Sequence, residues 1–125
     1  MIEKKHWEQV AKDIFWYEAP STILDDSAPP FFKWYPDGVT NACYNALDIH
    51  VEGGRGDQTA LIYDSPVTNS KSKFTYSELL DRVARFAGVL ASLGVVKGDR
   101  VLVYMPMVPE ALIGMLACAR LGAIH

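Results

Sequence analysis

Residues Val101–His125, VLVYMPMVPEALIGMLACARLGAIH, decide the fold that we predict for this chain. The run Val101–Tyr104 is entirely apolar or aromatic, which is typical of a β-strand buried on both faces. A helix is predicted over Pro109–Leu121, because proline fits the first turn of a helix, where a missing N–H costs nothing. Gly122 is placed to end that helix in a left-handed conformation. We therefore expect strand, helix and strand in succession, with Ala123–His125 opening the second parallel strand.

A second helix is predicted upstream, and a capping box marks its start. In Thr75-x-x-Glu78 the threonine hydroxyl can accept a hydrogen bond from the Glu78 amide, while the glutamate carboxylate reaches back to the Thr75 amide. The helix is expected to continue to about Leu93, with Gly94 ending it. Its apolar residues recur on one face at helical spacing: Leu79, Val83, Phe86, Ala87 and Leu90.

The segment before this helix is predicted to be a β-hairpin. Thr59–Tyr63 and Phe74–Thr75 have residues typical of strands, and the polar stretch Ser65–Lys73 separates them. With the elements downstream, Phe74–His125 predicts the order strand, helix, strand, helix, strand. The predicted fold class is therefore α/β, with an opening hairpin and βαβ units that the chain leaves incomplete.

The first part of the chain, Met1–Gly38, is predicted to be an arm that lies over the surface of a larger body. Lys4–Phe15 has apolar residues at helical spacing and should form one amphipathic helix. Glu18–Gly38 is rich in proline and in aromatic residues, so it should lack a regular element and be anchored by its rings. A disordered tail is the alternative. The body, residues 39–125, should begin with a helix over Asn41–Val51.

Composition limits the class of protein. The chain has 125 residues, half of them hydrophobic, which suffices for one domain and argues against disorder over most of its length. A net charge of −3 gives no electrostatic argument for a nucleic acid or an anionic membrane as partner. Cys43 and Cys118 are interpreted as buried thiols rather than a disulfide. No secretory signal or membrane-spanning run is present, so we predict a cytoplasmic protein, or a mitochondrial matrix protein that has lost its presequence.

Residues that could carry chemistry are few, and we predict no catalytic, cofactor-binding or metal-ligating residue in this chain. His6, His50 and His125 lie far apart, and none has metal-ligand spacing to a cysteine or carboxylate. The sequence contains neither a G-x-G-x-x-G after a strand nor a G-x-S-x-G. The one hint of a site is Tyr104–Val108, because ligands of open parallel sheets bind at the carboxyl ends of the strands.

Three stretches give the whole chain a specific resemblance to the AMP-forming acyl-CoA synthetases of the acetate and propionate type. Val103–His125 resembles the family block YMPM-x-PEA…MLACAR-x-GA-x-H. Residues 41–50, NACYNALDIH, resemble the family helix N-x-x-x-N-x-x-D-R-H, with Ile49 where arginine is usual. The arm, WEQVAKDIFWYE…PPFFKWYPDG, resembles the leading segment of the family. Tyr63–Thr68 is more similar to the propionate-preferring branch than to acetyl-CoA synthetases proper.

The resemblance implies the reaction of an adenylate-forming ligase. A short-chain carboxylate attacks the α-phosphate of ATP held with Mg²⁺, giving an acyl-adenylate and pyrophosphate. The thiol of CoA then displaces AMP to form acetyl-CoA or propionyl-CoA. The implied partners are these small molecules, with no nucleic acid and no membrane.

The family residues that bind nucleotide and catalyse adenylation have no counterpart in this sequence, so no functional residue can be carried over to it. The leading hypothesis is the N-terminal part of such a ligase: an arm over residues 1–38, then the start of the AMP-binding large domain over 39–125, truncated at His125. This segment alone should be inactive and bind no cofactor. Two alternatives remain: a self-contained α/β binding module of flavodoxin type, and a truncated paralogue that associates with the full-length enzyme.

Overall fold

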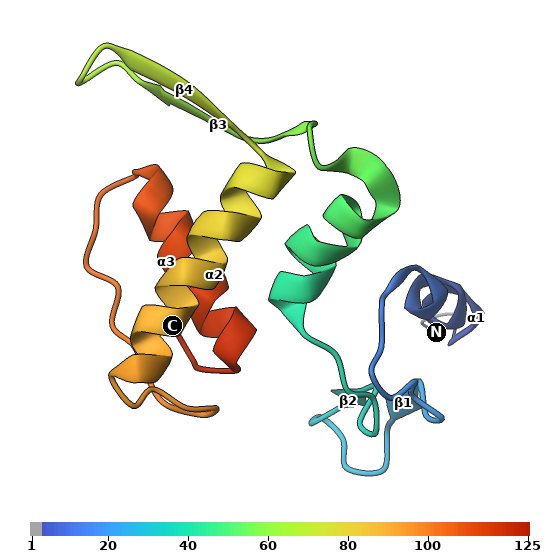
Figure 1. Ribbon diagram of the computed structural model, residues 1–125. Helices are drawn as coiled ribbons and strands as arrows, with labels where there is room; N and C mark the ends of the chain where they lie inside the picture. Colours follow the sequence, from blue (N-terminus) through green and yellow to red (C-terminus); the bar gives the residue numbers. More distant parts are fainter. Residues whose placement is uncertain (1–3) are drawn as a thin grey trace. The chain divides into compact units, whose positions relative to one another are not determined.

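A computed structural model describes residues 4–125, which divide into two compact units at the boundary between Asn41 and Ala42. The elements of the first unit are the helix α1 (Lys4–Val10), a 3₁₀ turn (Ala11–Asp13) and the strands β1 (Leu24–Asp25) and β2 (Lys33–Trp34). Those of the second are two π-helical segments (Tyr44–Asp48 and Val51–Arg55), the strands β3 (Thr59–Ser65) and β4 (Ser70–Thr75), and the helices α2 (Tyr76–Ser92) and α3 (Pro109–Leu121). Figure 1 shows their order along the chain.

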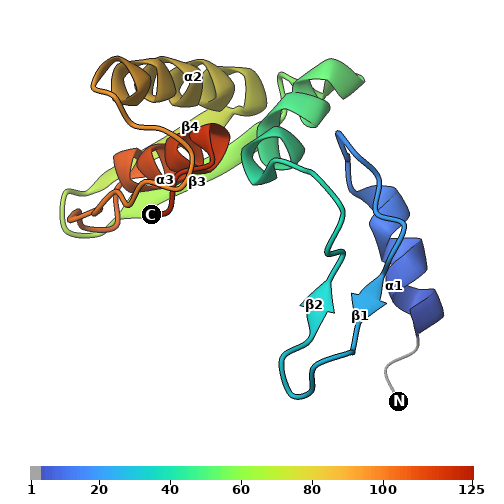
Figure 2. The ribbon, with the colours of Figure 1, turned by 90° about the horizontal axis from the view of Figure 1, so that it is seen from below.

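The first unit is held together by aromatic rings and one carboxylate. The helix predicted over Lys4–Phe15 is shorter than expected, because the backbone is already extended at Ile14. The proline-rich stretch is mostly irregular, as predicted, but β1 and β2 pair antiparallel (Figure 2). The rings of Trp7 and Trp34 lie 5.0 Å apart, and those of Trp16 and Tyr35 lie 5.3 Å apart. These half-exposed rings pack against one another and contribute the apolar contacts of this short unit.

Asp37 ties the two ends of this unit's loop together. Its carboxylate accepts hydrogen bonds from the backbone N–H of Ser21 at 2.8 Å and of Thr22 at 3.2 Å, and from the Ser21 hydroxyl. Hydrogen bonds stabilise the ionised carboxylate, so those from Ser21, with that from Thr22, lower the pKa of Asp37 to about 2.

The lowered pKa of Asp37 predicts an acid transition confined to the first unit. Because the pKa falls from 3.8 to about 2 on folding, the stabilisation is complete above about pH 4 and is lost as the pH approaches 2. All three tryptophans, Trp7, Trp16 and Trp34, belong to this unit, so their fluorescence reports on it alone. We expect a red shift of the emission across that window, absent in Asp37→Asn and retained in the control Asp13→Asn. An unchanged transition in Asp37→Asn would contradict this account.

The second unit has its core between α2 and α3, which pack side by side (Figures 1 and 2). The apolar face predicted for α2 is confirmed, since four of its five residues are buried and Phe86 is half-buried. The capping box is confirmed as well, with Glu78 N donating to Thr75 Oγ1 at 3.2 Å and Thr75 N donating to Glu78 Oε2 at 2.8 Å. The buried residues of this core are Cys43, Leu47, Leu79, Val83, Ala87, Leu90, Ile113, Ala117, Cys118 and Ala123.

The predicted bounds of α3 and the predicted hairpin are also confirmed. The helix spans Pro109–Leu121, and Gly122 ends it in the left-handed region with φ of 72°. The antiparallel pair β3–β4 forms the predicted hairpin, with a tighter turn at residues 66–69 than the polar stretch suggested. The two cysteines are free and buried, as predicted.

The prediction of regular parallel strands in this unit is wrong. Val101–Tyr104 is not a β-strand, and the predicted strand at Ala123–His125 contributes only a parallel bridge between Arg100 and Ile124. Val101 N donates to Ile124 O at 2.8 Å, and beyond this bond Leu102 and Tyr104 are 93% and 97% exposed. A strand buried on both faces needs neighbouring strands and two covering layers, and residues 4–125 supply only the one parallel bridge. A self-contained flavodoxin-type module would need several such strands.

The helix predicted over Asn41–Val51 extends further, with helical turns from Ala42 to Arg55. We call this segment helix 42–55. It contains two wide π-helical segments, in which a backbone N–H bonds to the carbonyl five residues earlier, as Ile49 N does with Tyr44 O. Gly54 departs from helical geometry with φ of 79°, so the kink falls within the glycine pair Gly53–Gly54.

Removing the cap of α2 should lower the stability of the second unit. Thr75→Ala leaves the amide of Glu78 without its side-chain acceptor, and we expect a loss of about 1 kcal/mol in the free energy of unfolding. Urea unfolding followed by far-UV circular dichroism measures this loss. Thr75→Ser keeps a hydroxyl in place and serves as the control, so equal losses in both variants would show that the cap does not matter.

Candidate functional site

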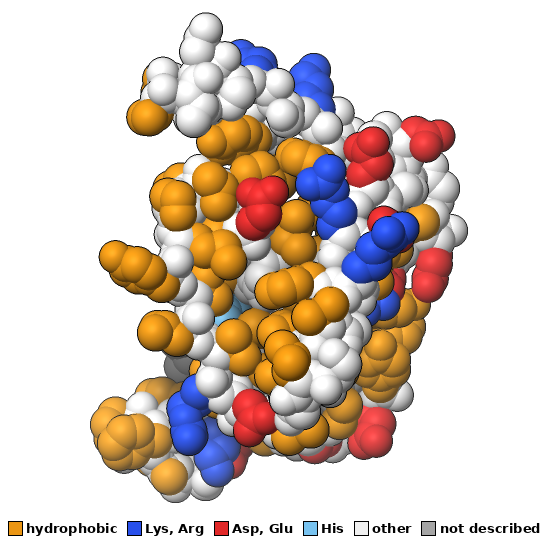
Figure 3. Space-filling model, turned by 60° about the vertical axis from the view of Figure 1, so that its left-hand side comes forward, with side chains coloured by type: hydrophobic (Ala, Val, Ile, Leu, Met, Phe, Trp, Pro, Cys, Tyr) orange, Lys and Arg blue, Asp and Glu red, His pale blue; other side chains and the backbone are white. Residues whose placement is uncertain are grey.

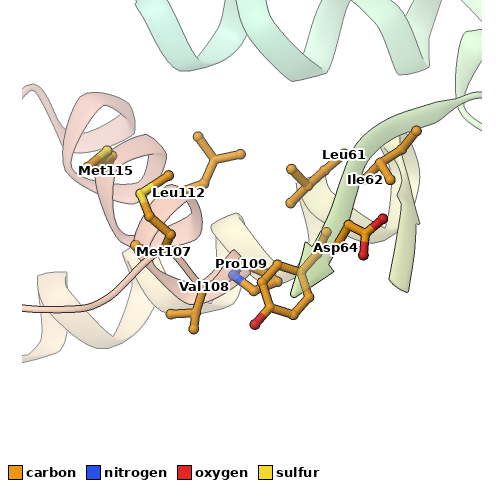
Figure 4. A pocket seen from close by; sticks show the side chains of 10 residues that line it. Leu61, Ile62, Asp64, Met107, Val108, Pro109, Leu112 and Met115 are labelled. Atoms are coloured by element: carbon orange, nitrogen blue, oxygen red, sulfur yellow. The ribbon is translucent and has the colours of Figure 1, made fainter. Parts of the chain in front are cut away.

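A pocket of about 380 Å³ lies between β3 and the start of α3. Figure 4 shows Leu61 of β3 and Leu112 of α3 on opposite sides of it, with Met107 and Val108 entering from the segment before α3. Its lining residues are Leu61, Ile62, Tyr63, Asp64, Met107, Val108, Pro109, Ala111, Leu112 and Met115. The segment Tyr104–Val108, expected from the sequence at the ligand side, therefore brings two of its residues to this pocket.

The pocket has the chemistry of a hydrophobic surface. Its one carboxylate, Asp64, is paired with Lys71 at 2.6 Å across the hairpin. Both partners of that ion pair are well exposed to solvent, so the pair adds little to stability. The lining offers neither a nucleophile beside a base nor a cluster of hydrogen-bond donors for an anion. The lining is suited to an apolar group.

The apolar surface continues outside the pocket. When the molecule is turned so that α3 and the segment before it come forward, hydrophobic side chains gather on the face seen (Figure 3). In the segment before α3, Leu102, Tyr104 and Met107 are each more than 90% exposed. So much contiguous apolar surface is typical of a face that another part of a protein covers.

Residues 4–125 contain neither a candidate metal site nor a candidate membrane-spanning helix. No group of three or more histidine, cysteine or acidic side chains in that range could hold a metal ion. Over the same residues, no helix combines the length and the hydropathy needed to cross a bilayer. In helix 42–55, the His50 side chain contacts Arg55, and its ring meets the Tyr76 ring edge-on, with 4.8 Å between the ring centroids. Burial and the Arg55 charge together lower the pKa of His50.

The most specific polar arrangement is an ion pair between residues 41–50 and Val103–His125, two stretches that were quoted above for their sequence motifs. Arg120, in the last turn of α3, donates from Nη1 to Asp48 Oδ2 and from Nη2 to Asp48 Oδ1, each at 2.9 Å. Nη1 also lies 3.7 Å from the sulfur of Cys43. Asp48 is 8% exposed, and this guanidinium pairs with its buried charge.

The surroundings of Arg120 and Cys43 change the pKa values of both groups. The hydrogen bond to Asp48 raises the pKa of Arg120 above its ordinary value, so the guanidinium stays charged. Burial raises the pKa of the Cys43 thiol, while the nearby guanidinium acts in the opposite direction. The thiol is therefore neutral at physiological pH and has no nucleophilic role in this setting. The cluster is structural: it joins helix 42–55 to α3.

Sequence reasoning did not pair Asp48 with Arg120, although a signal was present. Arg120 is the one basic residue of a largely apolar helix, and a charge on a partly buried surface favours a partner of opposite charge. The sequence alone could not identify Asp48 as the partner of Arg120, because the two residues are 72 positions apart.

Comparison with known proteins places this fold in a family. Residues 48–125 match the family model described as AMP-binding enzyme, and residues 3–46 match the model described as acetyl-coenzyme A synthetase N-terminus. The chain belongs to the AMP-binding enzyme family. It corresponds to the N-terminal part of short-chain acyl-CoA synthetases, and the predicted resemblance to that family is confirmed.

Two relatives and one solved structure show how similar this chain is to individual proteins. The chain is 50% identical over 122 residues to human acyl-CoA synthetase short-chain family member 3, mitochondrial, covering 98% of this chain and 18% of the relative. It is 48% identical over 119 residues to acetyl-coenzyme A synthetase of Streptomyces coelicolor, covering 95% and 18% of the two chains. Among solved structures, acetoacetyl-CoA synthetase from Streptomyces lividans matches with a TM-score of 0.85 at 33% identity, over 96% of this chain and 18% of that one. The chain thus spans about a fifth of the length of its relatives.

Replacing Arg120 by lysine should destabilise the second unit. Lysine keeps the charge but cannot make two parallel hydrogen bonds to Asp48, so we expect a loss of between about 1 and 3 kcal/mol in the free energy of unfolding, measured with urea. The matched control is Arg85→Lys, in an exposed pair with Asp81, where the change should stay below about 0.5 kcal/mol. Equal losses at both sites would contradict a special role for Arg120.

Proposed function

We propose that this chain is the N-terminal part of an AMP-forming short-chain acyl-CoA synthetase. The observation that carries the proposal is the shared fold with acetoacetyl-CoA synthetase, which extends over 96% of this chain at 33% sequence identity. The Asp48–Arg120 pair adds support, because it joins the two stretches of sequence that resemble this family most closely.

The proposed reaction of the whole enzyme has two steps. A short-chain carboxylate attacks the α-phosphate of ATP, and pyrophosphate leaves as the acyl-adenylate forms. The sulfur of CoA then attacks the acyl carbon, and AMP leaves as the thioester forms. ATP and CoA follow from the family, and Mg²⁺ is proposed with them because it neutralises phosphate charge in such reactions.

Within that enzyme we propose a scaffolding role for this chain. Residues 1–38 would form the N-terminal arm, and 39–125 the start of the AMP-binding large domain. The proposal is supported by the apolar, chemically inert pocket and by the exposed side chains of Leu102, Tyr104 and Met107. In the complete domain, Val101–Tyr104 would become the buried strand that its composition favours, once neighbouring strands pair with it.

The preferred carboxylate and the cellular compartment are proposals that go beyond what the comparisons establish. The preference for propionate, inferred from Tyr63–Thr68, stays a prediction, since acetyl-CoA synthetases match at nearly the same identity as the human short-chain enzyme. The two free, buried thiols support a reducing compartment, and we propose the cytoplasm or the mitochondrial matrix. The name of the human relative gives its own location as mitochondrial.

A chimera tests the proposed function. The chain is joined to the part of Streptomyces coelicolor acetyl-coenzyme A synthetase that follows the matched region, and AMP release is measured with ATP, Mg²⁺, CoA and either acetate or propionate. We expect carboxylate-dependent AMP release from the chimera and none from the Streptomyces part without it. A folded but inactive chimera, beside an active Streptomyces enzyme, would contradict the proposal.

Calorimetry tests the inert role of the chain by itself. Titration of the 125-residue chain with ATP–Mg²⁺, with propionate and with CoA should give no heat of binding, because no anion-binding cluster lines its pocket. Saturable binding of ATP or CoA to the folded chain would overturn the scaffolding role and favour a self-contained binding module.

A further inference from the structure

Helix 42–55 has few apolar anchors to the rest of its unit. Its buried residues are Cys43, Leu47 and Asp48, and the segment after Asp48 has none that is fully buried. By contrast, α2 and α3 each bury four residues, largely against one another. Regions with few buried contacts open at a lower free energy than the core around them.

Backbone features at both ends would let this helix move as a unit. At its start, the boundary between the two compact units falls between Asn41 and Ala42. Near its end, Gly54 has φ of 79°, and neither Gly53 nor Gly54 has a packing neighbour where a Cβ would point. Just beyond, Ser77 N donates to Gly56 O at 3.0 Å and holds the chain to the start of α2. A hinge at the two glycines would leave that attachment intact.

The π-helical winding places two side chains of this helix on one partner. In a π turn a residue lies above the one five positions earlier, so Cys43 and Asp48 come onto the same face. In an ordinary α-helix, residues five apart would diverge by about 140°. Arg120 contacts both side chains, through Cys43 Sγ at 3.7 Å and the Asp48 carboxylate at 2.9 Å.

We propose that helix 42–55 opens from α2 and α3 as a separate unit, and that the Arg120–Asp48 pair with Cys43 is the latch that holds it closed. The latch is a conformational device of this segment, and it stands independently of the proposed enzymatic function. The ion pair is the charged, bidentate part of the attachment of this helix, beside the buried side chains of Cys43 and Leu47 and the ring contact of His50 with Tyr76.

The chain carries its own reporters for this motion. Cys43 is 0% exposed in helix 42–55, and Cys118 is 1% exposed in α3. Cys118 precedes Arg120 by two residues, which turns it about 200° around α3, away from the latch. Opening of helix 42–55 alone would therefore expose Cys43 and leave Cys118 covered, whereas global unfolding would expose both.

The experiment is thiol labelling of the native 125-residue chain with an excess of a small alkylating reagent over a series of low urea concentrations. Labelled peptides are resolved by mass spectrometry. We expect Cys43 to react about 10-fold or more faster than Cys118 in the absence of urea. The rate at Cys43 should depend weakly on urea, because a local opening exposes little surface, and the rate at Cys118 should depend steeply on it.

Two variants locate the latch. Asp48→Asn removes the charge with little change of shape, and we expect it to accelerate labelling of Cys43 by about 10-fold or more. The control, Ile113→Val, lies in α3 beside Phe86 and Val89 of α2. It should accelerate labelling of Cys118 alone, since it weakens the α2–α3 core equally in the closed and the opened states.

Equal rates and equal urea dependence at the two cysteines of the unsubstituted chain would overturn the proposal, because helix 42–55 would then open only with the whole unit. An unchanged Cys43 rate in Asp48→Asn would overturn the role of the ion pair. If Asp48→Asn fails to fold, the comparison of the two cysteines in the unsubstituted chain still decides whether the helix opens by itself.

Discussion

The Arg120–Asp48 pair is the contact on which the second unit depends, because it resolves a conflict within α3. That helix is apolar enough to be buried, yet its last turn carries a guanidinium. Arg120 keeps 32% of its side chain exposed, whereas Asp48 is 8% exposed, and a carboxylate so buried is costly unless a cation of matching geometry meets it. Asp48 provides that carboxylate with two bonds of 2.9 Å, and the requirement fixes helix 42–55 against α3. The interaction therefore specifies an arrangement more than it adds net stability.

The same requirement gives a reason for the unusual winding of helix 42–55. An α-helical backbone would turn Cys43 and Asp48 to different sides, whereas the π turn brings both to Arg120. A wide turn has poorer backbone geometry than an α-helix, and tertiary contacts must offset that cost. Local structure in this segment is thus set by a contact from far along the chain, rather than by the propensities of its own residues.

This contrast explains which elements the sequence allowed us to predict. The capping box at Thr75, the proline at position 109 and Gly122 act within one turn of the backbone, and the helices they delimit were predicted almost to the residue. The hairpin was predicted for the same reason, since a turn joins strands that are neighbours in sequence. The run Val101–Tyr104 has the composition of a buried strand, but a strand exists only where another strand pairs with it. Composition could therefore give the tendency of this run but not its actual conformation.

The candidate site could likewise be predicted from the sequence only in part. The segment Tyr104–Val108 was expected on the ligand side, and two of its residues do line the pocket, but its meeting with Leu61 of β3 depends on tertiary packing that spacing does not give. Two of the motifs that identify the family also meet at the ion pair between Asp48 and Arg120. A motif can be specific for a structural reason, because a buried charge without its matching partner disrupts the fold. The specific pattern in this chain thus preserves the interior of the second unit, and the apolar residues Leu102, Tyr104 and Met107 remain exposed beside it.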